Sequence, residues 1–157
     1  MLEKKGNIIY ISHGGGPMPV LGDHSHRKMV QFLKGLSEKL PRPDEVLVIS
    51  AHWESEVPTI YNAANQKLLF DYFGFPAESY EIEYPTKENG DLVSLIESSF
   101  KEKNIDYKID TTRGIDHGVF IPLMLMYPDG NLPVTQLSLV KGLNPKTHIE
   151  LGKALQS

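Results

Sequence analysis

The residues best suited to chemistry in this sequence are six histidines, and no cysteine accompanies them. His13 follows residues 7–12, a β-branched and aromatic run that is typical of a buried strand. His52 follows residues 45–50, a nearly continuous apolar run that is typical of a central parallel strand. Because cysteine is absent, disulfides, thiolate metal sites and cysteine nucleophiles are excluded, and a metal would need histidine, carboxylate or water ligands.

The positions of these two histidines indicate a shared crevice. In open parallel α/β sheets, ligands bind outside the carboxyl ends of the strands, so His13 and His52 point into one crevice if their strands are neighbours. A histidine at a strand end can equally be a structural residue, and both interpretations stay open. His117 lies in residues 113–118, a turn-like segment that opens a helix, but its spacing alone does not place it in the crevice.

The remaining histidines carry weaker signals. His24 and His26 resemble a local metal pair, although histidines at a helix entry are more often solvated or capping. His148 lies on a predicted helix beside Lys146 and Glu150, and we expect it to be exposed at the surface.

Other motifs give partial matches. The run His13-Gly14-Gly15-Gly16 resembles the oxyanion loop of lipase-like hydrolases, but the chain lacks the Gly-x-Ser-x-Gly nucleophile elbow that such enzymes need. The glycines would let the backbone approach a ligand or simply form a tight turn. Residues 71–76 form an aromatic cluster that could line the pocket of a planar substrate. Packing onto a sheet would explain this cluster equally well.

The elements that must position these side chains alternate along the chain. Strands are expected at residues 7–12, 45–50, 57–61, 106–110 and 134–139, and helices at 25–40, near 119–126 and from Asn144-Pro145 onward. Asn89 is the expected cap of a further helix, and residues 62–88 form an irregular excursion. This order predicts an α/β fold of three layers, α/β/α, around a mostly parallel central sheet, in a single domain of residues 1–157.

Composition narrows the classes of function. The 157 residues carry 16 Lys and Arg against 20 Asp and Glu, a net charge of 16 − 20 = −4, which argues against nucleic-acid binding. No apolar run reaches the roughly 18 residues that span a bilayer, so we expect no membrane association. We expect a cytoplasmic protein without a leader peptide, and an open sheet edge would allow it to form a homo-oligomer.

Several blocks in the same order resemble one known family. They are residues 12–14 with 17–18, residues 50–54, 71–76 and 113–118, and residues 126–128 with 133–139. Together they resemble the class III extradiol ring-cleavage dioxygenases, in the DOPA-dioxygenase-like branch of the LigB superfamily. The resemblance implies that a catechol-type substrate is cleaved with O2 at ferrous iron, with Zn²⁺ as the other candidate metal. It also implies metal ligation by His13 and His52. His117 would be the acid–base residue, and in zinc-loaded relatives a third ligand.

The resemblance also raises a question of length. Members of the family are longer, and a further metal ligand comes from their C-terminal third. We therefore expect this domain to be cut short at its C-terminus and its metal site to be incomplete. Two alternatives remain: a zinc-binding, hydrolase-like site that uses metal-activated water, and a non-catalytic binding member of the superfamily.

Overall fold

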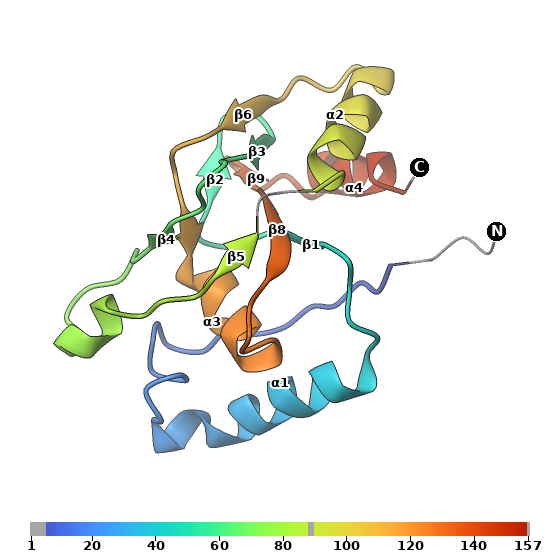
Figure 1. Cartoon of the computed structure of the whole chain (residues 1–157). Coiled ribbons are helices and arrows are strands. Elements are labelled where there is room, and N and C mark those ends of the chain that lie inside the picture. Colours follow the sequence, from blue (N-terminus) through green and yellow to red (C-terminus); the bar gives the residue numbers. More distant parts are fainter. Residues whose placement is uncertain (1–5, 88–89, 157) are drawn as a thin grey trace.

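The structure is a computed structural model, and it describes residues 6–87 and 90–156 (Figure 1). The helices are α1 (Arg27–Lys39), α2 (Leu92–Glu102), α3 (His117–Met126) and α4 (Pro145–Ala154), with two 3-10 turns, η1 (His24–His26) and η2 (Ala77–Tyr80). The strands are β1 (Val46–Val48), β2 (Glu54–Ser55), β3 (Thr59–Tyr61), β4 (Leu68–Leu69), β5 (Thr86–Lys87), β6 (Lys108–Asp110), β7 (Ile115–Asp116), β8 (Leu132–Leu137) and β9 (Leu139–Val140).

The main sheet has the order β1-β8-β3-β6, and β5 pairs with the start of β8. The pairs β1–β8, β3–β6 and β5–β8 are parallel, and only β3–β8 is antiparallel within the described residues. Two short parallel pairs, β2–β9 and β4–β7, form separate two-stranded sheets. The prediction of a mostly parallel α/β sheet is confirmed.

Alternating side chains divide the core into two layers. Tyr61 and Val134 pack on one face of the sheet, in the cluster that contains α3 and Leu33 of α1. Ile60 and Leu137 point to the other face, where they pack against residues of α2 and α4. This alternation follows from the two-residue repeat of a strand, and it gives the predicted α/β/α layers. In Figure 1, α1 lies below α3, and α2 lies beside α4 at the top.

Helix α3 is the central element of the first layer. Its residues Val119, Phe120 and Ile121 are fully buried, and apolar side chains surround its axis on all sides. A helix that is apolar all round is buried between other elements, and α3 lies between the sheet and α1 (Figure 1). Its first residue, His117, is therefore held in a rigid environment.

Of the two predicted helix caps, Asn144 and Asn89, the structure describes one. The Asn144 side chain accepts hydrogen bonds from the backbone N–H groups of Lys146 and Thr147, as the cap prediction requires. The predicted cap Asn89 lies outside the described residues. At the start of α2, the Glu45 carboxylate accepts hydrogen bonds from the N–H groups of Asp91 and Leu92.

The predicted strand at residues 7–12 is wrong. Residues 7–12 have no strand conformation, and the side chains of Ile8 and Tyr10 are almost completely exposed. β-branched composition favours a strand only where a neighbouring strand completes its hydrogen bonds, and none of the described strands pairs with this segment. The expected excursion at 62–88 contains β4, η2 and β5.

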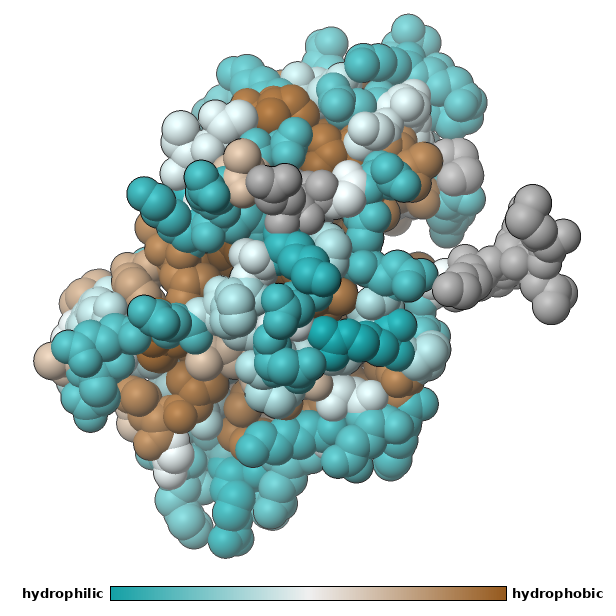
Figure 2. Space-filling model, viewed as in Figure 1, coloured by the Kyte–Doolittle hydropathy of each residue, from teal (hydrophilic) through white to brown (hydrophobic). Residues whose placement is uncertain are grey.

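The surface is mixed in character. Figure 2 shows hydrophilic atoms along the lower edge, over α1, and apolar atoms at the left of the same face. Among the described residues, no helix combines the length and the apolar character that crossing a membrane requires.

Candidate metal centre

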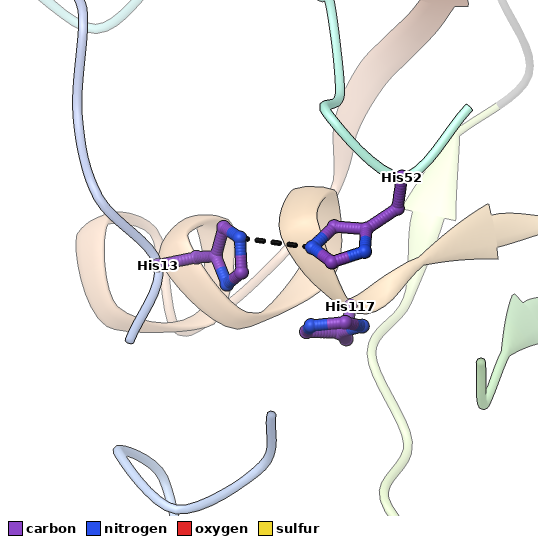
Figure 3. Close-up of side chains that lie close together, drawn as sticks. All are labelled: His13, His52 and His117. Carbon is purple, nitrogen blue, oxygen red and sulfur yellow. Dashed lines mark hydrogen bonds between the residues drawn. The ribbon is translucent and has the colours of Figure 1, made fainter. Parts of the chain in front are cut away.

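Three histidines from distant parts of the chain meet at one point. His13 follows the exposed N-terminal segment, His52 lies in the loop between β1 and β2, and His117 is the first residue of α3. One ring nitrogen of each lies within 4.8 Å of the others, and Figure 3 shows the three rings facing a common space. The strand predicted before His13 is absent, but the His13 ring still lies at the site.

The spacing of the rings fits metal ligation. The Nε2 atoms of His13 and His52 are 3.0 Å apart. Two nitrogens bound to one metal at about 2.1 Å lie about 3.0 Å apart for a right-angled arrangement and about 3.4 Å apart for a tetrahedral one. The same separation suits an N–H···N hydrogen bond when one ring donates, so the pair is also satisfied without a metal.

The state of His13 favours a metal as well. Its Nδ1, the ring nitrogen that does not bond to His52, is buried and has no hydrogen-bond partner within residues 6–87 and 90–156, so it is the alternative to Nε2 as the atom that binds a metal. Burial, followed by the neighbouring rings of His117 and His52, lowers the pKa of His13. Neutral imidazole is the form that binds metals, and a set of imidazole donors suits iron, zinc, copper or nickel. These residues therefore fit a divalent transition metal.

A glycine turn carries His13. Gly14 has a φ of +81°, and a Cβ added there would lie 2.7 Å from the His26 ring, so a larger residue does not fit. The His26 ring accepts a hydrogen bond from the Gly15 N–H at Nε2, and its Nδ1 lies 2.7 Å from the Asp23 carboxylate. Both ring nitrogens of His26 are thus used, and it acts as a structural support for the turn rather than in a metal pair with His24.

A buried polar network holds the His52 loop. The Ser50 hydroxyl donates to Asp116 (2.6 Å) and accepts from the His52 N–H (3.2 Å). Arg113 donates to Asp116 (3.0 Å) and to the His52 carbonyl oxygen (3.1 Å), and its guanidinium lies over the Trp53 ring. Asp116 is completely buried.

Asp116 precedes His117 in the sequence, but its side chain belongs to the network that holds the His52 loop. That position suggests that Asp116 orients His117 or caps α3, but its side chain makes no cap hydrogen bond and contacts Ser50 and Arg113 instead. Gly118 completes this junction, because a Cβ there would lie 2.7 Å from the Ser50 hydroxyl and 2.9 Å from the His52 ring.

The carboxylate that hydrogen-bonds to the His117 ring belongs to Asp71, and sequence reasoning missed it. Its Oδ1 lies 2.7 Å from the His117 Nδ1 and accepts a hydrogen bond from the His117 backbone N–H. Its Oδ2 lies 3.8 Å from the His52 Nδ1. Burial raises the pKa of Asp71, but the hydrogen bonds from His117 outweigh it and hold that pKa below its usual value. The only sequence signal was the carboxylate at the head of the aromatic block 71–76.

That aromatic block lies beside the site. The Tyr72 ring meets the His117 ring edge-on, with centroids 5.6 Å apart, and Phe75 packs on Tyr72. His148, in contrast, lies apart from the centre. It is half-buried rather than exposed, because its ring accepts the Val140 N–H and contacts the Asn144 carbonyl oxygen.

The chain is similar to several known proteins. Residues 7–157 match the family model described as the catalytic LigB subunit of aromatic ring-opening dioxygenase. The chain is 37% identical over 158 residues to the dioxygenase tasH of Hapsidospora irregularis, covering 96% of this chain and 49% of that protein. It is 39% identical over 154 residues to a 4,5-DOPA dioxygenase extradiol of Beta vulgaris, covering 94% of this chain and 55% of that protein.

A solved structure resembles the fold. A crystal structure of an uncharacterized protein from Escherichia coli K12 superposes with a TM-score of 0.63 at 27% identity, covering 80% of this chain and 46% of that one. The chain spans about half the length of the curated relatives it matches. Since the family model covers nearly all of it, the chain belongs to the LigB family of aromatic ring-opening dioxygenases.

Proposed function

We propose that this chain provides the histidine side of an extradiol dioxygenase centre that opens the ring of a catechol-type substrate with O2. His13 and His52 would bind ferrous iron, and His117 would act as the acid–base residue, or as a third ligand if zinc is bound. The convergence of the three rings within 4.8 Å, in a chain of this family, carries the proposal. Because the relatives are about twice as long, we propose the metal centre for this chain and ring cleavage for a chain of the relatives' full length.

The roles differ because the surroundings differ. His117 is only 5% exposed, and its Nδ1 is engaged by Asp71, which leaves Nε2 to accept a proton from a substrate hydroxyl and to return it later. Imidazole suits this exchange near neutral pH. Bound ferrous iron would supply the redox chemistry with O2 and lower the pKa of the catechol hydroxyls. Tyr72, which lines the His117 ring, would help to exclude water from this proton.

Metal binding by the chain itself tests the first half of the proposal. Calorimetric titration of the metal-free chain with Zn²⁺, and anaerobically with Fe²⁺, should give one site. The double variant His13→Ala/His52→Ala should lose that site. Unchanged binding in the double variant would overturn the assignment of the centre.

Catalysis tests the second half. A chain of the relatives' full length, loaded with Fe²⁺, should consume O2 and release a yellow ring-opened product from the catechol L-DOPA. His117→Ala should abolish the product. Because zinc is redox-inert, ester hydrolysis by the zinc-loaded protein without O2 uptake would instead favour a hydrolase-like function. Neither activity, with metal still bound, would favour a binding member of the family.

A further inference from the structure

We infer that Asp71 is a positioning residue that fixes the orientation and the tautomer of the His117 ring, and thereby sets how tightly the centre holds a metal. This inference rests on the proposed metal centre. It begins with one carboxylate that contacts two of the three rings: Oδ1 meets the His117 Nδ1 at 2.7 Å, and Oδ2 lies 3.8 Å from the His52 Nδ1.

The chemistry of a carboxylate determines the tautomer. An ionised carboxylate only accepts hydrogen bonds, so the His117 Nδ1 must carry the hydrogen in the 2.7 Å contact. In the neutral ring, Nε2 then carries the lone pair. That nitrogen is free to bind a metal or to take a proton, whereas the opposite tautomer would block it. Hydrogen bonds of this kind raise the basicity of a ligating histidine and fix its ring.

The fold supplies this contact through a two-residue ladder. Strand β4 pairs with β7 in the register Leu69↔Asp116, which brings the end of β4 beside the start of α3, and Asp71 reaches His117 from the turn that follows β4. The Asp71 N–H donates to the Leu69 carbonyl oxygen and keeps the turn closed. Arg113, the cationic side chain of the neighbouring Ser50–Asp116 network, is already bound to Asp116, so it does not draw Asp71 away from His117.

A purely structural role must be separated from this one, because Asp71 also accepts the His117 backbone N–H at the start of α3. Asp71→Asn makes the separation. Its amide oxygen can take the place of Oδ1 and accept both the backbone N–H and the Nδ1–H of His117, so both contacts are kept while the charge is gone. Asp71→Ala removes both contacts, and Asp129→Asn, at an exposed position paired with Arg42, is the matched control.

The experiment measures the Zn²⁺ dissociation constant of the 157-residue chain by competition with a chromophoric chelator, and the His117 tautomer in the metal-free chain by ¹⁵N NMR. We expect Asp71→Ala to release the fixed Nδ1–H tautomer of His117, and Asp71→Asn to keep that tautomer but to weaken Zn²⁺ binding about 10–100-fold, because the charge that raises the basicity of the ring is gone. The urea midpoint of Asp71→Asn should stay close to that of the control. Asp129→Asn should change none of the three.

Two results would overturn the inference. One is a Zn²⁺ dissociation constant for Asp71→Asn within twofold of the unchanged chain. The other is an Nε2–H tautomer of His117 already present in the unchanged chain. If the unchanged chain binds no Zn²⁺ at all, the proposed centre fails instead. The metal-free NMR spectrum would then still decide whether Asp71 fixes the ring.

Discussion

Replacing Arg113 by methionine should destabilise this protein far more than the loss of a surface charge would. The Arg113 side chain is 12% exposed and its partner Asp116 is completely buried. The substitution therefore leaves a carboxylate in the interior, and among the described residues the Ser50 hydroxyl is its remaining side-chain hydrogen-bond donor. The guanidinium also donates to the His52 carbonyl oxygen and lies over Trp53. Methionine keeps much of the apolar stem and removes all of these polar contacts.

The magnitude follows from the burial of the pair. Breaking a buried ion pair by removing one partner costs about 3–5 kcal/mol, because an uncompensated charge remains inside. A domain of this size has a free energy of unfolding of about 5–15 kcal/mol, so the loss is a large part of the total. Adding Asp116→Asn to Arg113→Met removes the stranded charge. We therefore expect the double variant to be no less stable than Arg113→Met alone.

Urea unfolding of the two single variants and the double variant forms a double-mutant cycle. We expect a coupling free energy of about 2 kcal/mol or more between Arg113 and Asp116. The ion pair of Arg42 and Asp129 is the control within the same chain, because the two side chains are 47% and 71% exposed. The same cycle there should give at most about 1 kcal/mol. If the Arg113–Asp116 coupling stays within about 0.5 kcal/mol, the two effects simply add and the reasoning from burial is refuted.

Three further outcomes can be measured. Gly118→Ala should cost about 1–3 kcal/mol by overpacking, since its Cβ would lie 2.7 Å from the Ser50 hydroxyl, and the displaced His52 ring should weaken Zn²⁺ binding in calorimetry. Asn144→Ala should cost about 1 kcal/mol in urea unfolding by removing the α4 cap, with the Zn²⁺ dissociation constant unchanged. Burial raises the pKa of Tyr84 to about 12. The folded chain therefore keeps this phenol protonated after the unfolded chain ionises near 10, and its contribution to stability is lost as the pH rises from 10 toward 12. Tyr84→Phe should remove the last step of an ultraviolet titration, and a step that persists would contradict this assignment.

Local features of the fold could be predicted from the sequence. Helix α4 was predictable because Asn144 and Pro145 act within one turn, and α1 because Met29, Leu33 and Leu36 repeat at helical spacing. The conformation of residues 7–12 could not be predicted in this way. A strand forms only where a neighbouring strand completes its hydrogen bonds, and an apolar run does not show whether that neighbour is present.

The site shows the same division between local and long-range information. His13 and His52 stood out because they follow apolar runs, and His117 because of its motif. Asp71 and Asp116 were harder to assign, since their partners are selected by pairing between segments far apart in sequence. Its position next to His117 suggests that Asp116 contacts the His117 ring. In the structure, the pairing of β4 with β7 brings Asp71 to that ring instead, and Asp116 binds Arg113.

The distances in sequence between the three histidines have a consequence for chain entropy. A metal that joins His13 to His52 closes a loop of 39 residues, and a link from His52 to His117 closes a second of 117 − 52 = 65. In the chain-entropy model of crosslinks, closing the first loop alone removes about 4 kcal/mol of freedom from the unfolded chain. A bound ion would therefore act as a reversible staple in a protein that has no cysteine to form a disulfide. Its withdrawal by a chelator would remove both links at once.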